Sequence, residues 1–304
     1  MTASFALALA AAREATAAQN HPRGALYLLA TPIGNLADIT LRALYLLEQA
    51  DCIACEDTRH TQALLRAYGL DKPQGAWLSL HRHNEAQGAQ VVLERLRAGQ
   101  RVVYASDAGT PGVSDPGARL VRDVRAAGLP IVPLPGPSSV TALLSVAGCV
   151  DDHGAFVFFG FLPTKAQERQ AAVETLRAEP RAVVLLEAPH RIAAAADALA
   201  PLGEREVTIG RELTKQFEEI ATVPCAGLAA WVQGNPQRTR GEFALVLHPA
   251  AVVEDAGAGD RALALLLQEL PVKTAVRLAA ELTGASRNTL YATALKMKGE
   301  SAPD

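Results

Sequence analysis

The sequence predicts an α/β protein with two α/β domains, mostly parallel sheets and a small helical module at its C-terminal end. Short apolar runs that fit buried strands alternate with segments of helical spacing along most of the chain. The 304 residues suit two domains and an appendage, on the prior of about 150 residues per domain. Hydrophobic residues make up 49% of the chain and charged residues 20%, which argues against disorder over most of its length.

The chain divides into four predicted segments. Residues 1–22 are rich in alanine and carry charge only at Arg13 and Glu14, which predicts a disordered or loosely helical tail. We expect residues 23–136 to form the N-terminal α/β domain and residues 137–249 to form the second. Residues 250–304 comprise a linker of small and polar residues, followed by a basic helical module.

Within the two domains, the apolar pattern places the strands and helices. Continuous apolar runs predict strands at residues 25–30, 52–55, 77–80, 102–105, 130–134, 155–161, 181–186, 206–209 and 243–247. Helical spacing predicts helices at residues 40–50, 62–68, 91–97, 118–127, 138–147, 165–177, 192–199 and 226–232. Because the carboxyl ends of parallel strands share one edge of a sheet, the loops that follow them can converge.

The loop at residues 106–117 is the strongest candidate for a ligand site. It follows a buried strand, precedes a helix, and is longer than most loops between such elements. Its glycines allow the backbone to approach a ligand closely, and Asp107 can fix a polar group. Similar loops at the same predicted edge occupy residues 31–36, 56–60 and 135–139. An ordinary strand-to-helix loop capped by Asp115 is the alternative.

The loops disfavour a phosphate-rich ligand. The chain contains neither G-x-x-x-x-G-K-[ST] nor a G-x-G-x-x-G after its first strand, which argues against a P-loop NTPase and a dinucleotide dehydrogenase. The glycine-rich loops also hold no lysine that could meet a triphosphate. A cationic or zwitterionic ligand without phosphate fits this acidic corner better.

We predict no metal site. Cys52 and Cys55 form a C-x-x-C, but they lie in a predicted strand, where positions three apart face opposite sides. No second cysteine pair completes a ligand set for zinc, and a redox role has no further support. His81 and His83 lack clustered partners, so a polar surface or a substrate contact is the better interpretation.

The composition also limits the compartment and the partners. Four cysteines in a chain of this length do not form a disulfide framework, so we expect a reducing, cytoplasmic location. No apolar run is long enough to cross a bilayer, so no membrane contact is expected. The net charge of −3 argues against a generally basic nucleic-acid coat, so any RNA contact must be local.

The C-terminal module is locally basic. Residues 261–300 carry six positive and three negative charges, a balance of +3. Residues 273–291 show the pattern of a helix, a glycine turn and a second helix capped by Ser286, which is typical of helix-turn-helix units that meet nucleic acid. A helical pair that only packs on the domain or on another subunit fits the pattern equally well.

Eight motifs carry a family resemblance. They are TPIGNL at residues 31–36, CEDTR at 55–59, SDAGTPGVSDPG at 106–117, PGPSS at 135–139, FGFLP at 159–163, EAPHR at 187–191, RELTK at 211–215 and RGEF at 240–243. Together they resemble the tetrapyrrole-methylase-like (class III) S-adenosylmethionine-dependent methyltransferases, in the branch that modifies small-subunit ribosomal RNA. The resemblance implies a cofactor cleft between two domains, a homodimer, and 2′-O-methylation of a cytidine of 16S ribosomal RNA near the decoding centre.

The resemblance also implies site residues. The S-adenosylmethionine site would use Pro32, Asp107, Thr110, Val113, Ser138, Ser139, Leu186, Gly241 and Glu242. The substrate side would use Arg59, His81, Asn84, Glu85, Arg191 and Lys215, with Glu56 or Asp57 as a catalytic base. Two alternative hypotheses for the function stay open. One is a methylase of this fold that acts on a tetrapyrrole or another small molecule, and the other is a non-catalytic RNA-binding assembly factor.

Overall fold

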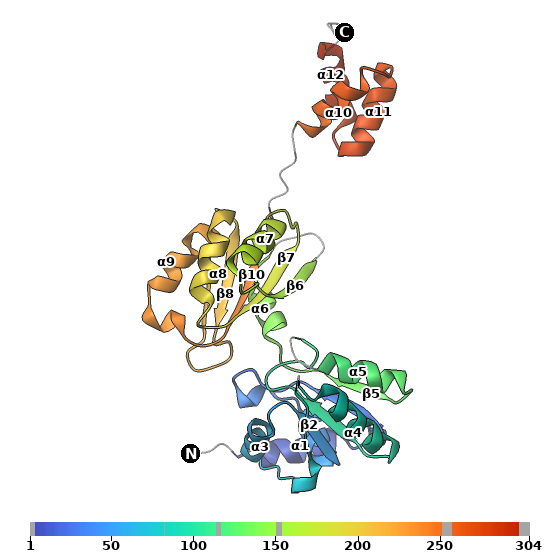
Figure 1. The fold of residues 1–304 in the computed structure, drawn as a ribbon, viewed down its shortest axis with the longest axis vertical. Helices are drawn as coiled ribbons and strands as arrows, with labels where there is room; N and C mark the ends of the chain where they lie inside the picture. The colour runs from blue at the N-terminus through green and yellow to red at the C-terminus, as the bar shows by residue number, and fades with distance from the viewer. Residues whose placement is uncertain (1–3, 82, 114–116, 150–153, 251–256, 298–304) are drawn as a thin grey trace. The chain divides into compact units, whose positions relative to one another are not determined.

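The computed structural model describes residues 4–81, 83–113, 117–149, 154–250 and 257–297. The chain separates into two compact units, residues 1–250 and residues 251–304. Among these described residues, the first unit contains two five-stranded sheets, and the second contains three helices (Figure 1).

The first sheet is entirely parallel, with strand order β3-β2-β4-β1-β5. Its strands are β1 (Leu26–Leu29), β2 (Cys52–Cys55), β3 (Trp77–Ser79), β4 (Val102–Ala105) and β5 (Ile131–Leu134). Every residue of β2 and β4 is buried, because both faces of the sheet are covered. The carboxyl ends of all five strands therefore lie at one edge, as the sequence predicts.

Helices cover both faces of this sheet. They are α1 (Ala6–Thr16), α2 (Leu41–Gln49), α3 (Thr58–Ala67), α4 (Glu85–Arg97) and α5 (Gly117–Ala126), with short 3-10 helices η1 (Leu36–Asp38) and η2 (Gln74–Ala76). The first three pack on the face that carries Tyr27 and Val103, and the last two pack on the face that carries Leu26 and Tyr104. This division follows from the alternation of side chains along each strand.

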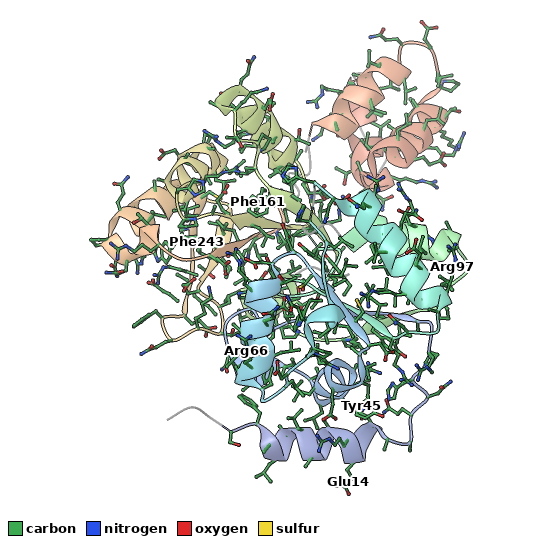
Figure 2. The ribbon with its side chains drawn as sticks, turned by 60° about the horizontal axis from the view of Figure 1, so that its bottom comes forward. Glu14, Tyr45, Arg66, Arg97, Phe161 and Phe243 are labelled. Atoms are coloured by element: carbon green, nitrogen blue, oxygen red, sulfur yellow. The ribbon has the colours of Figure 1, made fainter. Side chains whose placement is uncertain are left out.

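Helix α1 lies in the segment that the sequence predicts as a disordered or loosely helical tail. Leu9 and Ala12 are buried in the core of the first sheet, and Arg13 forms an ion pair with Glu48 of α2. Figure 2 shows α1 beside the part of the chain that carries Tyr45. The small residues let α1 pack closely on α2, so this helix belongs to the first unit rather than to a loose tail.

The second sheet has strand order β6-β7-β10-β8-β9. Its strands are β6 (Phe156–Phe161), β7 (Ala182–Glu187), β8 (Glu206–Arg211), β9 (Glu219–Pro224) and β10 (Phe243–Leu247). Only β6 and β7 run parallel, whereas the other three neighbouring pairs are antiparallel, which corrects the expectation of a mostly parallel second sheet. The physical reason is β9, which is not among the strands that the apolar pattern predicts. It returns beside β8 after a short loop, and β10 then inserts between β7 and β8.

Helices also cover the second sheet. Helices α7 (Ala166–Arg177), α8 (Ile192–Leu199) and α9 (Leu228–Gln233) pack on one face, near the 3-10 helices η3 (Ala200–Leu202), η4 (Cys225–Gly227) and η5 (Pro236–Thr239). Helix α6 (Ser139–Ala147) packs on the other face, against Val184 and Val246. The N-terminal end of α6 therefore lies where the last loop of the first sheet meets the second sheet.

The C-terminal unit consists of α10 (Ala258–Leu266), α11 (Val272–Thr283) and α12 (Arg287–Met297). Its core is formed by Leu263, Val276 and Leu290 together with small alanines. Gly284 ends α11 in the left-handed conformation, at φ 73°, which allows the sharp turn into α12. Within the described residues, no helix combines the length and the apolar character needed to cross a membrane.

Candidate active site

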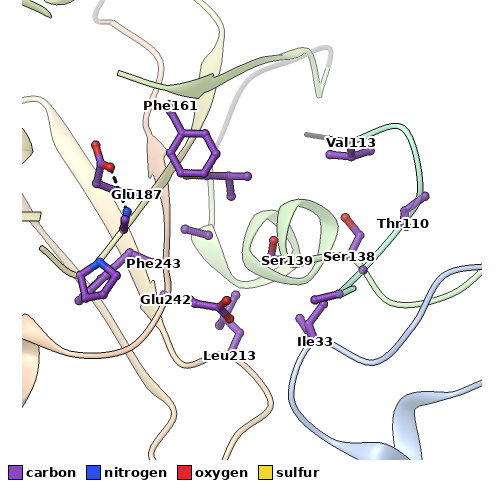
Figure 3. Close-up of a pocket in the computed structure, with 17 residues that line it drawn as sticks. Ile33, Thr110, Val113, Ser138, Ser139, Phe161, Glu187, Leu213, Glu242 and Phe243 are labelled. Atoms are coloured by element: carbon purple, nitrogen blue, oxygen red, sulfur yellow. Dashed lines mark hydrogen bonds between the residues drawn. The ribbon is translucent and has the colours of Figure 1, made fainter. Parts of the chain in front are cut away.

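A cavity of about 330 Å³ lies in the first unit, with walls from both sheets. The loops after β1, β4 and β5 supply one wall, and the ends of β6, β7, β8 and β10 supply the other. Figure 3 shows Thr110 and Ser138 on one side of the cavity and Glu187 and Phe243 on the other. The described lining residues are Ile33, Ala108, Gly109, Thr110, Val113, Ser138, Ser139, Phe161, Leu186, Glu187, Ala188, Pro189, Gly210, Leu213, Glu242, Phe243 and Ala244.

Hydrogen bonds between loops hold the first wall together. The backbone of Thr31 exchanges two bonds with Gly109, at 3.0 and 3.1 Å, and its hydroxyl donates to the carbonyl of Ser106 at 3.0 Å. The hydroxyl of Thr110 donates to the carbonyl of Pro137 at 3.0 Å. The loops after β1, β4 and β5 are therefore fastened to one another, and they present a fixed polar surface.

The second wall carries a buried carboxylate. Glu187 is only 4% exposed, and its Oε1 accepts a hydrogen bond from the amide of Ala188 at 2.9 Å. The same oxygen lies 3.0 Å from Nε of Arg191, whose guanidinium also donates to the carbonyl of Leu162. Arg191 is thus held beside the cavity by the protein itself.

The charge of the cavity favours a cation. Its described lining residues include two carboxylates, Glu187 and Glu242, and contain neither lysine nor arginine. Hydroxyls of Thr110, Ser138 and Ser139 add donors and acceptors, while the remaining walls are largely apolar. Such a cavity suits a ligand with a positive centre, polar ends and apolar parts.

The structure brings most of the expected cofactor residues together. Thr110, Val113, Ser138, Ser139, Leu186 and Glu242 line the cavity. Pro32, Asp107 and Gly241 are not among its described lining residues, although each precedes one of them in the chain. The carboxylate of Asp107 instead accepts a weak hydrogen bond from the amide of Asp57, at 3.4 Å.

A second group of expected residues lies at the carboxyl ends of β2 and β3. It comprises Glu56, Asp57, Arg59, His81, Asn84 and Glu85. None of them is among the described lining residues of the cavity. Because β4 neighbours β2, the contact between Asp57 and Asp107 links this group to the loop that forms the cavity wall.

Several members of the second group are engaged within the protein. Asp57 caps α3 by accepting the amide of Arg59 at 2.9 Å, and its two oxygens also bond the Arg59 guanidinium at 3.2 and 3.1 Å. The hydrogen bond from the Arg59 side chain holds the pKa of Asp57 below its usual value. Asn84 accepts from the amide of His81 at 2.8 Å and donates to the carbonyl of Ser79 at 2.9 Å. Glu85 lies 4.0 Å from Arg119.

His81 differs from these neighbours. Its Nδ1 is buried and has no hydrogen-bond partner among the described residues. The ring lies 6.0 Å from that of His83. In the described part of the chain, no group of three or more histidine, cysteine or acidic side chains gathers in a way that could hold a metal ion.

Some lining residues were not among the sequence-based candidates. Phe161, Glu187, Leu213 and Phe243 all line the cavity. Each lies within one of the eight motifs, so motif membership was the available signal. What the sequence could not reveal is which residue of each motif points into the cavity.

Two family models match the chain. A model described as Tetrapyrrole (Corrin/Porphyrin) Methylases matches residues 25–229, and a model described as RsmI C-terminal HTH domain matches residues 253–298. The first match spans both sheets apart from β10, and the second includes all three helices of the C-terminal unit.

Individual relatives agree with these matches. The chain is 45% identical over 284 residues to ribosomal RNA small subunit methyltransferase I of Escherichia coli O157:H7, an alignment that covers 92% of this chain and 98% of that protein. It is 42% identical over 287 residues to the protein of the same name from Pseudomonas aeruginosa, covering 91% and 99%. A solved structure of cobalt precorrin-4 methyltransferase, a cobalamin biosynthetic enzyme, is similar in fold alone. Its TM-score is 0.55 at 20% identity, over 75% of this chain and 98% of that one.

Proposed function

Because the chain belongs to the ribosomal RNA small subunit methyltransferase I family of tetrapyrrole-type methylases, we propose that it transfers a methyl group from S-adenosylmethionine to small-subunit ribosomal RNA. The acceptor in this proposal is the 2′-hydroxyl of a cytidine in 16S ribosomal RNA, near the decoding centre. Family membership makes the chain a methyltransferase. The cavity is the observation that supports S-adenosylmethionine as the cofactor, and the C-terminal unit supports RNA as the substrate.

The cavity fits S-adenosylmethionine by its donor set. This cofactor supplies a methyl group activated by a positively charged sulfur. Glu187 and Glu242 place carboxylates at the cavity, each paired with a cation outside the lining, and the described lining itself contains no lysine or arginine. Thr110, Ser138 and Ser139 provide hydroxyls for polar groups, and Phe161 and Leu186 provide apolar contact. In this arrangement the protein chiefly binds and orients the two reactants.

A base would assist the attack of a weakly acidic ribose hydroxyl. Of the two expected candidates, we favour Glu56. Both oxygens of Asp57 already bond Arg59, and the lowered pKa makes Asp57 the weaker base. Glu56 directly follows β2 and precedes this cap, so it lies at the same sheet edge without serving as the cap of α3.

The RNA substrate fits the C-terminal unit. Its region matches a helix-turn-helix model, and Lys273 and Lys296 are exposed on α11 and α12. Exposed cations can contact phosphates without sequence preference. Acting on ribosomal RNA would also account for a cytoplasmic location.

We further propose that the chain acts as a homodimer. Phe156 and Phe158 share one face of the edge strand β6 and are 45% and 37% exposed. Val146 of α6 is 53% exposed as well. Exposed aromatic side chains on an edge strand favour burial against a second copy of the chain. Sedimentation equilibrium of the wild type and of a Phe156→Ser/Phe158→Ser variant tests this, and a monomeric wild type would contradict it.

The decisive experiment is methyl transfer to ribosomal subunits that lack the modification. Methyl-labelled S-adenosylmethionine should label the 16S ribosomal RNA, and mapping should place the label on a cytidine 2′-oxygen. The same enzyme incubated with tetrapyrroles should transfer nothing. Binding of the cofactor without any transfer would favour the non-catalytic assembly factor, and transfer only to a small molecule would favour the other methylase reading.

A further inference from the structure

The loop between β8 and β9 is held in an unusual conformation. Glu212 and Thr214 adopt left-handed backbone angles, with φ 51° and 66°, although neither is glycine. Such angles persist only where the surroundings impose them. Here the amide of Thr214 donates to Glu218 at 2.6 Å, and buried Arg211 donates to the carbonyls of Arg240 and Phe217 at 2.8 and 3.2 Å.

This loop meets the loop that follows β1 in the first sheet. The amide of Asn35 donates to the hydroxyl of Thr214 at 3.1 Å. A Cβ atom added to Gly34 would lie 2.3 Å from Cγ of Lys215 and 3.0 Å from the carbonyl oxygen of Leu213, so only glycine permits the approach. Ile33 and Leu213, which flank this contact, both line the cavity.

Lys215 joins two carboxylates at the same place. Its Nζ lies 2.8 Å from Oε1 of Glu212 and 2.9 Å from Oε2 of Glu242. Oε1 of Glu212 also accepts the backbone amide of Glu242 at 2.9 Å. Gly241, at φ 85°, leaves room for the side chain of Glu212, because a Cβ atom added to Gly241 would lie 2.4 Å from Cγ of Glu212. Burial lowers the pKa of Lys215, but its bonds to Glu212 and Glu242 outweigh burial and raise it, so the amine stays charged.

We propose that Lys215 is a positioning residue of the cofactor site, which holds Glu242 at the cavity and braces the loop against Gly34, rather than a residue that contacts RNA. The inference rests on the proposed function, because it assumes that the cavity binds S-adenosylmethionine. Glu242 is the lining residue that Lys215 reaches, and its side chain is 73% exposed. Without Lys215, none of the ion pairs among the described residues holds this side chain, and Glu212 loses its hydrogen bond to the ammonium.

The charges of the cluster disfavour a phosphate contact. Two carboxylates bond the one ammonium of Lys215, and the Lys215 side chain is only 29% exposed. A phosphate would have to approach two negative groups and displace at least one of them from the amine.

The test compares cofactor and RNA affinity in full-length protein. Lys215→Met keeps much of the apolar stem and removes the charge. Lys165→Met is the matched control, because Lys165 also pairs with a glutamate, at 2.9 Å, but lies at the start of α7 and is not among the described lining residues of the cavity. S-adenosylmethionine affinity is measured by calorimetry, and affinity for 16S ribosomal RNA is measured by filter binding at two salt concentrations.

We expect Lys215→Met to weaken cofactor binding about tenfold and to leave RNA binding and its salt dependence at the level of Lys165→Met. Glu242→Gln should give a similar loss, and the double variant should lose little more, because both changes remove one interaction. A merely structural role of Lys215 would instead lower the melting temperature of the cofactor-free protein and add fully to Glu242→Gln.

Three results would contradict either this inference or the function on which it rests. The inference is overturned if either Lys215→Met or Glu242→Gln binds S-adenosylmethionine as tightly as the wild type does. Reduced RNA affinity with normal cofactor affinity assigns Lys215 to the substrate. A wild type that binds no S-adenosylmethionine refutes the proposed function itself, which separates that failure from the failure of this inference.

Discussion

The hydroxyl of Thr110 donates a hydrogen bond to the carbonyl oxygen of Pro137 at 3.0 Å, and so ties the loop after β4 to the loop that leads into α6. Thr110 and the adjacent Ser138 both line the cavity. We therefore predict that Thr110→Val weakens S-adenosylmethionine binding. Loss of one such bond costs about 0.5–1.5 kcal/mol, which corresponds to roughly 2- to 10-fold in affinity.

Thr110→Ser is the matched control for this prediction. Serine keeps the hydroxyl and loses only the methyl group, so its affinity should stay near that of the wild type. Calorimetric titration of the three proteins gives the comparison. A loss of affinity in the serine variant, with normal affinity in the valine variant, would show that the methyl contact matters and the hydrogen bond does not.

Much of the first wall could be predicted from the sequence, since continuous apolar runs identify a parallel sheet. Once β1, β4 and β5 are parallel, the loops that carry Thr110 and Ser138 must share an edge. The second wall could not be predicted in this way. Strand β9 is an edge strand in which exposed and half-buried residues alternate, and its sequence EIATVP lacks the apolar run that identifies a buried strand.

Single residues of the site were harder to predict than loops. Glu187 ends an otherwise apolar strand and is indistinguishable in sequence from a surface acid. In the buried position its carboxylate bonds the amide of Ala188 and the guanidinium of Arg191, and both partners belong to the turn between β7 and α8. Asp57 shows the reverse, because the acid that the sequence offers as a base is used to cap α3.

Glu56 and Asp57 should separate in a kinetic comparison. We predict that Glu56→Gln lowers kcat by about 10²–10⁴-fold, as expected for loss of a general base. Asp57→Asn should reduce kcat far less, since asparagine can still accept the amide of Arg59. Single-turnover methyl transfer at saturating S-adenosylmethionine is the measurement, and the reverse ranking would assign the base to Asp57.

The C-terminal unit should contribute to RNA binding without affecting the cofactor. A chain that ends at Ala250 keeps the whole first unit, so its affinity for S-adenosylmethionine should not change. Its affinity for 16S ribosomal RNA should fall at least tenfold, on the order of what loss of a few phosphate contacts gives. In the full chain, Lys296→Ala should reduce the salt dependence by about one phosphate contact.

Arg277→Ala is the internal comparison for the RNA prediction. Arg277 lies 3.1 Å from Glu281, which also pairs with Arg287, so its charge is already partly compensated. Its replacement should change RNA affinity less than that of Lys296. Filter binding over a range of salt concentrations measures both, and unchanged RNA affinity in the truncated chain would contradict a role of the unit in substrate binding.

Helix α1 should stabilise the first unit. Leu9 is buried against the core, whereas Leu7 on the same helix is 86% exposed. We predict that Leu9→Ala lowers the free energy of unfolding by about 2–3 kcal/mol, while Leu7→Ala changes it by less than about 0.5 kcal/mol. Urea unfolding followed by circular dichroism measures both variants. If both have the stability of the wild type, α1 does not contribute to the core in solution.

The four cysteines should differ in reactivity as their environments do. Burial raises the pKa of both Cys55 and Cys225 to about 11, and it also raises the pKa of Cys52. At pH 8 a thiol of pKa 11 is ionised in only about one molecule in a thousand, and the thiolate is the nucleophile.

Cys149 is partly exposed, so iodoacetamide should modify it first in the native protein. Modification of the buried thiols should accelerate as the pH rises toward 11, and in urea all four should react at similar rates. Mass spectrometry of timed samples follows each site, and rapid alkylation of Cys52 or Cys55 at pH 8 would revive a redox role for the C-x-x-C pair.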